Sequence, residues 1–287
     1  MTRRAFALVA VLLVFLGGAS GAQAGALRAG SFRLLTYNVA GLPEGISKSR
    51  PSLNMGLISR LVNDYDIVLA QEDFAFQALL RSSLTLPHRS PDYAPIGAFD
   101  LGDGLSRFSR TEFVEYRREV WATCNGVVGD GCDCLANKGF SVARHALSGG
   151  AHIDVYNLHM DSGRSAADRV TRKAQLEQLR RAISRYSSRR AVIVAGDTNL
   201  TRVELPELAR FEKSLGLSDS CRSVGCSQPW RIDRVLYRSG AAVNLVPRRW
   251  RLDARFVDGD ARPLSDHLAV AVDFDWATPE PHLVSAR

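Results

Sequence analysis

Several polar side chains in this sequence stand where short apolar, strand-like runs end or begin. They comprise carboxylates, carboxamides and two imidazoles, namely Asn38, Glu72, His159, Asp197, Asn199, Asp233, Asp266 and His267. The ends of neighbouring strands meet at one edge of a sheet, so we expect these groups to share a cleft. Oxygen ligands of this kind suit a hard cation such as Mg²⁺ or Ca²⁺, and an imidazole beside a carboxylate suits proton transfer. The set therefore indicates metal-assisted hydrolysis.

Hydrolysis of a phosphodiester is one reaction that would use both a hard cation and a proton-transfer pair. The anionic phosphate oxygens repel an attacking water, and a cation on a non-bridging oxygen offsets that charge. An aspartate near the water and an imidazole with a carboxylate partner manage the protons. An amide donor holds the charge that develops during attack.

Each of these residues also has an ordinary structural explanation when it is taken alone. Asn38 could form a turn after its strand, and residues 197–199 could cap a helix. Asp266 could be a loop residue, and His159 could be a hydrogen-bonded core histidine. The functional hypothesis depends on their joint occurrence in one chain.

The hydrophobic pattern predicts the elements that position these groups. Apolar runs predict strands over 32–37, 66–70, 113–121, 140–144, 152–158, 191–195, 232–237, 241–247 and 268–274. Helical spacing predicts helices over 53–62, 73–80, 165–186 and 205–215. Residues 84–112 are rich in Pro, Gly, Asp and Ser and predict a long loop, and the tail from Thr278 is expected to be disordered. We interpret the basic positions of the 165–186 helix as solvated surface: Arg169, Arg172, Lys173 and Arg180.

The composition is that of an ordinary globular protein. Of 287 residues, 46% are hydrophobic and 23% are charged, with no repeat or interdomain linker, so we expect one mixed α/β domain over 25–287 with two stacked sheets. The net charge is +7, and loss of Arg3 and Arg4 with a signal peptide leaves +5. This excess suits nucleic acid or anionic lipid and equally an arginine-rich proteome, so charge alone decides nothing.

Residues 1–24 are typical of a signal peptide. Arg3 and Arg4 precede an uncharged apolar stretch over 5–16, and residues 22–24, Ala-Gln-Ala, form a small-x-small cleavage site. The apolar stretch is shorter than the ~20 residues that span a bilayer. We therefore expect a secreted or periplasmic protein with no transmembrane segment in the mature chain. A monomer is a separate expectation.

Five cysteines follow the predicted signal, and disulfides form in oxidising compartments. Cys221 and Cys226 bracket a short loop and are expected to pair. A second bridge is expected from Cys124 to Cys132, with Cys134 reduced and buried, although Cys134 is nearly as close to Cys124. The spacing lacks two matched Cys-x-x-Cys pairs, which disfavours a zinc site.

Seven short segments together resemble the endonuclease/exonuclease/phosphatase superfamily. They are TYNVAGL, AQED, NKGF, NLHMDS, VAGDTNL, RIDRVLY and LSDHLAV, and they run in family order across residues 33–274. This superfamily includes deoxyribonucleases, apurinic endonucleases, inositol-polyphosphate phosphatases and neutral sphingomyelinases. The resemblance implies a four-layer α/β/β/α sandwich of two packed mixed sheets, with the active site at one edge.

The resemblance also implies a metal site. Glu72 matches the main metal-binding carboxylate, and Asn38 lends an amide oxygen to the same ion. Asp266 lies beside the metal, directly or through water. The expected cofactor is Mg²⁺, with Mn²⁺ and Ca²⁺ as alternatives.

The remaining matched residues have implied catalytic roles. Asp197 orients or deprotonates the attacking water, and Asn199 donates to a phosphate oxygen. His267 contacts the phosphate or transfers a proton, and Asp233 orients it. His159 binds the phosphate or assists the leaving group.

Two further residues are candidates for substrate binding. Lys138, in the NKGF segment, matches a lysine of the sphingomyelinase-like branch that could approach phosphate, but it could equally be an exposed turn lysine. Asp161 follows His159 and is expected to line the cleft.

Three functions compete at this point. A sphingomyelinase-type phosphodiesterase, which acts on a phospholipid headgroup and contacts the membrane surface, fits the export signal and the NVAGLP, NKGF and NLHMDS segments best. A secreted nuclease would suit the charge, but no aromatic stacking platform is interleaved with the basic residues. A non-catalytic binding module on the same fold remains the third alternative, and the intact residue set argues against it.

Overall fold

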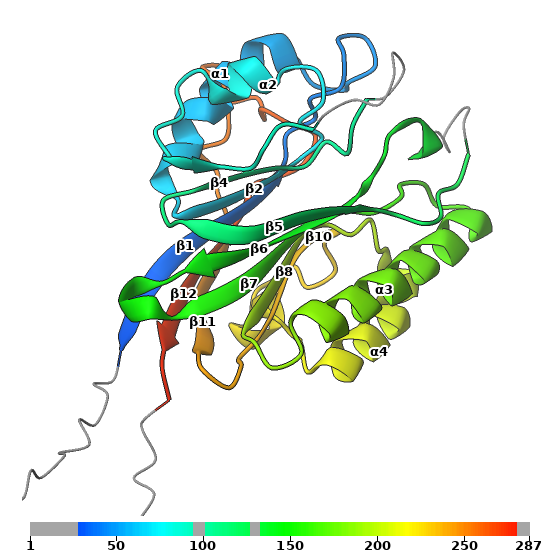
Figure 1. Cartoon of the computed structure of the whole chain (residues 1–287). Coiled ribbons are helices and arrows are strands. Elements are labelled where there is room, and N and C mark those ends of the chain that lie inside the picture. Colours follow the sequence, from blue (N-terminus) through cyan, green and yellow to red (C-terminus); the bar gives the residue numbers. More distant parts are fainter. Residues whose placement is uncertain (1–27, 94–100, 127–132, 280–287) are drawn as a thin grey trace, which may run out of the picture.

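Two six-stranded sheets packed face to face form the centre of the computed structural model, which describes residues 28–93, 101–126 and 133–279. Helices cover the two outer faces, with α1 and α2 on one side and α3 and α4 on the other (Figure 1). The predicted signal peptide 1–24 and most of the tail from Thr278 lie outside the described residues.

The first sheet has strands far apart in sequence as neighbours. In spatial order it contains β11 (Asn244–Leu252), β12 (Val270–Ala277), β1 (Ala29–Asn38), β2 (Ile67–Gln71), β4 (Ser106–Ser109) and β3 (His88–Arg89). Only β1 and β2 are parallel, and their register pairs Asn38 with Gln71. Asn38 and Glu72, the residue after Gln71, therefore leave the sheet at the same edge.

The second sheet repeats this arrangement. In spatial order it contains β5 (Phe113–Val120), β6 (Gly139–Ala146), β7 (His152–His159), β8 (Val192–Asp197), β10 (Asp233–Arg238) and β9 (Ser218–Asp219). The parallel β7 and β8 pair His159 with Asp197, and the antiparallel β10 pairs Asp233 with Asp197. Three polar side chains therefore stand in one row across three strands.

The helices connect these strands. They are α1 (Pro51–Leu61), α2 (Gln77–Arg81), α3 (Ala166–Tyr186), α4 (Leu205–Leu215) and α5 (Ser220–Ser223), with short 3₁₀ turns η1 (Val62–Asp64), η2 (Asp133–Leu135), η3 (Ser148–Gly150) and η4 (Arg202–Glu204). The long α3 begins with a capping box in which the Ser165 and Asp168 side chains each bond the other's backbone N–H. No helix in the described part of the chain is both long and apolar enough to cross a membrane.

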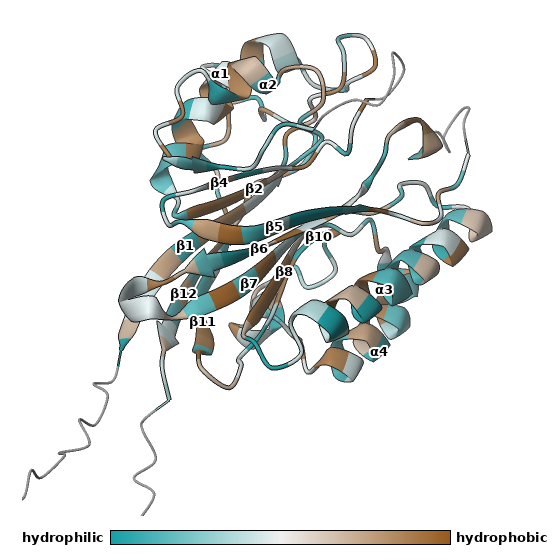
Figure 2. Cartoon of the chain, viewed as in Figure 1, coloured by the Kyte–Doolittle hydropathy of each residue, from teal (hydrophilic) through white to brown (hydrophobic). Residues whose placement is uncertain are grey.

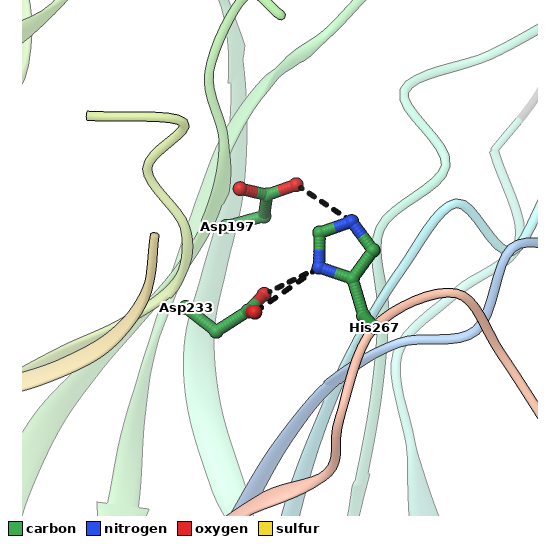
Figure 3. Close-up of side chains that lie close together, drawn as sticks. All are labelled: Asp197, Asp233 and His267. Carbon is green, nitrogen blue, oxygen red and sulfur yellow. Dashed lines mark hydrogen bonds and ion pairs between the residues drawn. The ribbon is translucent and has the colours of Figure 1, made fainter. Parts of the chain in front are cut away.

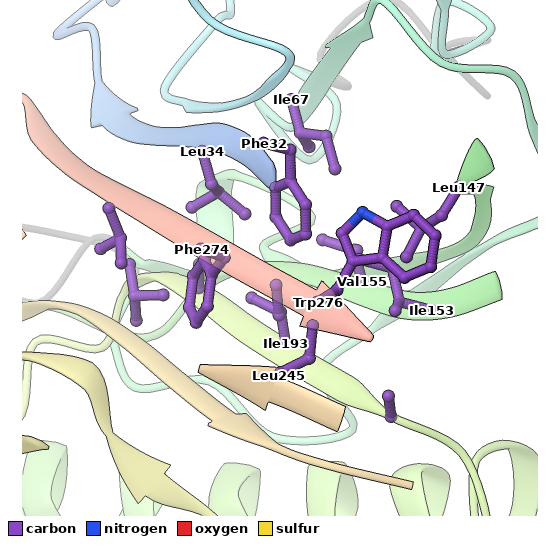
Figure 4. Packing of buried hydrophobic residues seen from close by; sticks show 14 of the residues in the cluster. Phe32, Leu34, Ile67, Leu147, Ile153, Val155, Ile193, Leu245, Phe274 and Trp276 are labelled. Atoms are coloured by element: carbon purple, nitrogen blue, oxygen red, sulfur yellow. The ribbon is translucent and has the colours of Figure 1, made fainter. Parts of the chain in front are cut away.

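Three apolar cores separate the layers. One lies between the sheets and includes Phe32, Leu34, Ile193, Phe274 and Trp276 (Figure 4). A second joins α3 and α4 to the second sheet, and a third joins α1 and α2 to the first sheet. Figure 2 shows hydrophobic colouring along β8 and hydrophilic colouring over much of α3. These cores confirm the expected four-layer α/β/β/α sandwich.

Polar bridges also join the two sheets. Beneath the edge that carries Glu72, Gln71 Nε2 donates to Asn157 Oδ1 at 2.7 Å, and Asn157 Nδ2 donates to Ala70 O at 3.0 Å. Further along, the buried Arg107 donates to Val155 O at 2.9 Å and to His145 Nε2 at 2.8 Å. These bonds satisfy polar groups inside an otherwise apolar interface.

The structure corrects two of the predicted elements. The helix expected over 73–80 begins only at Gln77, because the chain turns sharply at Glu72 and Asp73 N bonds Gly104 O instead. The expected loop 84–112 contains β3 and β4, of which β4 pairs with β2. Residues 94–100 of that expected loop lie outside the described residues.

Candidate active site

Glu72 projects from a sharp backbone turn directly after β2. Its φ is +57°, a left-handed conformation that non-glycine residues rarely adopt. Asn38, at the end of the parallel β1, donates from Nδ2 to Glu72 Oε1 at 2.8 Å and to Asp197 Oδ2 at 3.2 Å. One amide therefore joins carboxylates that come from the two different sheets.

The row in the second sheet depends on close approach of β7 and β8. Gly196, just before Asp197, has a φ of +144°, and a Cβ there would lie 2.0 Å from Leu158 O. A side chain at this position would force the two strands apart. Gly196 therefore allows the neighbouring His159 and Asp197 to stand side by side.

His267 reaches this row from the segment between β11 and β12 (Figure 3). Its Nδ1 lies 2.9 and 3.1 Å from the two carboxylate oxygens of Asp233, and its Nε2 lies 3.7 Å from Asp197 Oδ2. Burial lowers the pKa of His267. The hydrogen bond and charge of Asp233 oppose this effect, and the charges of Asp197 and Asp266 add to them. The net result is a pKa raised to about 10. The imidazole therefore carries its proton at neutral pH.

Asp197 has a very different environment. Its side chain is buried, and burial followed by the charge of Asp233 raises the pKa of Asp197 to about 6. The carboxylate is then mostly ionised at neutral pH and is a stronger base than an ordinary aspartate. The backbone N–H of Asn199 donates to its Oδ1 at 3.0 Å and holds it in place.

His159 is buried with no hydrogen-bond partner for either ring nitrogen among the described residues. Its Nε2 lies 3.5 Å from Asp197 Oδ2 and 3.8 Å from Glu72 Oε1. Burial lowers the pKa of His159 well below its ordinary value, and the charges of Lys138 and His267 lower it further. The site thus combines a neutral and a protonated imidazole.

Asn199 holds the end of β8 against the end of β7. Its φ is +50°, again left-handed, and its Nδ2 donates to Met160 O at 3.0 Å. A carboxamide nitrogen carries two N–H groups, and the bond to Met160 O uses only one of those on Asn199. Strained residues persist where their surroundings fix them, and here Glu72 and Asn199 are both strained and both at the cluster.

Asp266 lies at the edge of the cluster rather than within it. It is exposed, and its Oδ1 is 3.5 Å from the hydroxyl of Ser265. Sequence reasoning gave no role to Ser265, which donates to Asn38 O at 2.7 Å and accepts from His267 N at 3.1 Å. The one indication in the sequence is that Ser265 lies in the LSDH segment, directly before Asp266 and His267.

The two substrate-binding candidates are engaged with protein groups. Lys138 forms an ion pair with the buried Asp133, which also accepts from Ser162 N at 2.9 Å. The Asp161 carboxylate accepts from Asn125 N and from Gln175 Nε2, both at 2.7 Å. In this structure Asp161 therefore anchors the neighbouring loop.

The second disulfide differs from the predicted pairing. Cys124 bonds Cys134, with Cα atoms 5.3 Å apart, whereas Cys132 lies outside the described residues. The short turn η2 and the bond from Cys134 N to Gly126 O bring Cys134 back to Cys124. The expected Cys221–Cys226 bridge is confirmed.

The interpretation of the whole basic face of α3 as solvated was wrong for Arg172. Its side chain is fully buried and pairs with Glu204, because its helix face packs toward the loops after β7 and β8. Arg169 and Lys173 are exposed, as expected, and Arg180 is partly exposed.

The residues at this edge fit a divalent cation. Glu72 Oε1 lies 2.8 Å from Asn38 Nδ2 and 3.8 Å from His159 Nε2, and this nitrogen has no hydrogen-bond partner among the described residues. Carboxylate and amide oxygens at such a place suit a hard cation. The Asn38 amide would contribute its oxygen only after its two ends exchange positions, because Oδ1 now accepts from Ala40 N. Asp197, Asp233 and His267 also offer ligand atoms within 4.8 Å of one another, but the bond to Asp233 already engages His267 Nδ1.

Fold and site together define a sandwich of two packed sheets with a cluster of carboxylates, amides and imidazoles at one edge. The chain belongs to the endonuclease/exonuclease/phosphatase family, whose sequence model matches residues 35–267.

Curated relatives and solved structures agree with this assignment. The sphingomyelinase of Mycobacterium tuberculosis is 31% identical over 269 residues, which cover 86% of this chain and 53% of that protein. The chain thus spans about half the length of the curated relatives it matches.

Two solved structures are similar in fold. A beta-toxin variant from Staphylococcus aureus with bound magnesium ions has a TM-score of 0.63 at 17% identity, covering 85% of this chain and 99% of that one. TDP2 from D. rerio, complexed with a single-strand DNA product, has a TM-score of 0.62 at 20% identity, covering 85% and 98%. At such identities these likenesses show the fold alone.

Proposed function

We propose that this protein is an exported, divalent-metal-dependent phosphodiesterase of the sphingomyelinase type, which acts on a phospholipid headgroup. The observation that carries the proposal is the convergence of Glu72, Asn38, His159 and Asp197 with the Asp233–His267 pair at one edge of the sandwich. The 31% identity to a sphingomyelinase over most of the chain supports a lipid substrate.

Glu72 would hold the cation, together with the Asn38 oxygen once that amide is reversed, and Asp266 would act from the edge of the cluster, directly or through water. Oxygen ligands favour Mg²⁺, and a neighbour in fold contains magnesium ions. When bound, the cation supplies charge neutralisation at a non-bridging phosphate oxygen.

The side chains then divide the remaining work. Asp197, with its raised pKa, accepts a proton from the attacking water. His267 starts protonated, and it either donates a hydrogen bond to the phosphate or gives its proton to the leaving oxygen, while Asp233 fixes the ring through Nδ1. The neutral His159 can donate from one ring nitrogen, and Asn199 offers its remaining N–H to a phosphate oxygen.

A substrate panel tests this proposal. The purified protein with Mg²⁺ is offered sphingomyelin, phosphatidylcholine, plasmid DNA, RNA and an inositol polyphosphate, with His267→Ala as the inactive control. We expect phosphocholine release from sphingomyelin and loss of that activity in the variant. Hydrolysis of DNA or RNA with no lipid turnover would replace the lipid proposal with the nuclease alternative, which the net charge of +5 without the predicted signal peptide would suit.

The predicted signal peptide supports export, and two disulfides among the described residues are compatible with an oxidising compartment. Expression of the full chain with analysis of the mature N-terminus tests this part. We expect cleavage after Ala24.

A further inference from the structure

Arg172, in the second turn of α3, makes an unusually complete set of buried contacts. Its Nε and Nη2 donate to the two carboxylate oxygens of Glu204 at 2.8 and 3.0 Å. The arginine side chain is 0% exposed and that of Glu204 is 5% exposed. This is a bidentate pair removed from solvent, a geometry that the planar guanidinium allows and a lysine does not.

The third nitrogen of Arg172 holds the loop that follows β7. Nη1 donates to the carbonyls of Asp161, Ser162 and Gly163 at 3.0, 2.8 and 3.0 Å. This loop begins two residues after His159. Arg172 therefore fixes the path of the chain as it leaves the β7 end of the site.

Glu204 holds the corresponding loop after β8. Its Oε2 accepts from Thr201 N at 3.1 Å and from Thr201 Oγ1 at 2.9 Å, which forms a capping box at η4. Thr201 stands two residues after Asn199. The Arg172–Glu204 pair thus connects the His159 loop with the Asp197–Asn199 loop.

The same two segments are joined again at the site itself. Met160 N donates to Asp197 O at 2.9 Å, and Asn199 Nδ2 donates to Met160 O at 3.0 Å. Bonds at both ends close a ring around the segments 159–163 and 197–204. Such a ring can hold Asn199 in its left-handed conformation, because a strained residue needs surroundings that leave it no alternative.

We propose that Arg172 and Glu204 are positioning residues that set the placement of His159 relative to Asp197 and Asn199. The inference rests on the proposed function, because that function gives these three residues their roles. Buried ion pairs are poor stabilisers compared with apolar packing, so fixing a geometry is the better explanation of this one.

A matched pair of variants separates positioning from general stability. Arg172→Lys keeps the charge but loses the fork, and Arg180→Lys makes the same change in the partly exposed Arg180–Glu177 pair of the same helix. In sphingomyelin hydrolysis we expect Arg172→Lys to lower kcat by ~10²-fold, the scale of a 1 Å misplacement, with KM nearly unchanged. Arg180→Lys should match the wild type.

Two further variants keep the test decisive if Arg172→Lys does not fold. Glu204→Gln removes the charge, and Thr201→Val removes one anchoring hydroxyl. Each should lower kcat while urea unfolding shows that the protein is folded under assay conditions. Folded variants of Arg172, Glu204 and Thr201 with wild-type kcat would overturn the proposal.

A second readout does not depend on activity. NMR spectra of the ¹⁵N-histidine-labelled protein report on the His159 ring, whose signals are assigned through their loss in His159→Gln. We expect these signals to shift in Arg172→Lys, or in Glu204→Gln if Arg172→Lys does not fold. They should stay in place in Arg180→Lys. Unchanged signals would contradict positioning. If the wild type hydrolyses no substrate of the panel, the proposed function fails, and these spectra alone decide whether the pair positions His159.

Discussion

The two carboxylate oxygens of Asp233 lie 2.9 and 3.1 Å from His267 Nδ1, at the meeting point of the two sheets. Asp233 begins β10, whereas His267 lies in the segment before β12. The pair therefore forms only when the sandwich is assembled. The hydrogen bond and charge of Asp233 help to raise the pKa of the His267 imidazole to about 10.

A double-mutant cycle tests whether this pair acts as a unit. We expect His267→Ala to cut kcat by ~10²-fold or more, the scale of a lost acid–base group, and Asp233→Asn to cost a large part of the same amount. Because the aspartate acts through the imidazole, the double variant should be little worse than His267→Ala. Losses that multiply in full would show independent roles and remove Asp233 as the orienting residue.

Stability at acid pH should depend on His145. Its buried Nε2 accepts from Arg107, and its Nδ1 can donate to Ser109 Oγ at 3.3 Å, so the neutral ring is satisfied. Burial, and then the charge of Arg107, lower its pKa well below 6.5. The unfolded chain therefore binds a proton here that the folded chain does not. The contribution of the neutral His145 ring to the free energy of unfolding is fully present above pH 6.5. It is lost as the pH falls toward the pKa of His145 in the folded protein.

Urea unfolding from pH 7 to pH 4 of the wild type and His145→Gln measures this effect. Below pH 6.5 the wild type should lose up to about 1.4 kcal/mol per pH unit more than the variant, which carries no titrating ring. Asp73 and Asp197, with pKa values raised to about 6, act in the opposite direction in both proteins and cancel in the comparison. Parallel curves for the two proteins would contradict this account.

Gly196 should be the costliest glycine to replace near the site. Gly196→Ala places a Cβ 2.0 Å from Leu158 O at a φ of +144°, and we expect a loss of at least about 3 kcal/mol of unfolding free energy. Gly56→Ala, in α1, is the control because no atom lies within 4 Å of its added Cβ. That change should gain roughly 0.5–1 kcal/mol. A neutral Gly196→Ala would show that β7 and β8 need not approach so closely.

Mass mapping of the non-reduced protein checks the disulfides. We expect peptides that link Cys124 to Cys134 and Cys221 to Cys226, with Cys132 alkylated as a free thiol. A Cys124–Cys132 peptide would contradict the pairing described here.

Much of the fold was readable from local pattern. The run before Asp197 is continuously apolar and β-branched, which is typical of a strand buried on both faces, and it forms β8. The strand β4 was missed because two serines and Arg107 make it look like a loop. Arg107 is buried because its guanidinium bonds groups of the opposite sheet, and that information is not local.

The site divides in the same way. Residues that lie in recognisable short segments, such as Asp197 in VAGDTNL, can be predicted to share a site. The structure brings Asp197 close to Asn38 and His159. The burial of Arg172 could not be predicted, because it depends on which loops pack beneath α3. The Thr201-x-x-Glu204 spacing, however, is typical of a capping box. It indicates the position of Glu204, the partner of Arg172, but not the position of Arg172.

Metal titration tests the central claim most directly. Release of phosphocholine from sphingomyelin is measured in EDTA and after addition of Mg²⁺, for the wild type, Glu72→Gln and the control Glu207→Gln on α4. We predict no turnover in EDTA, saturable recovery for the wild type and the control, and ~10²-fold or greater loss for Glu72→Gln at all Mg²⁺ concentrations. Full turnover in chelator, or a Glu72→Gln variant as active as the wild type, would contradict a metal-dependent phosphodiesterase centred on Glu72.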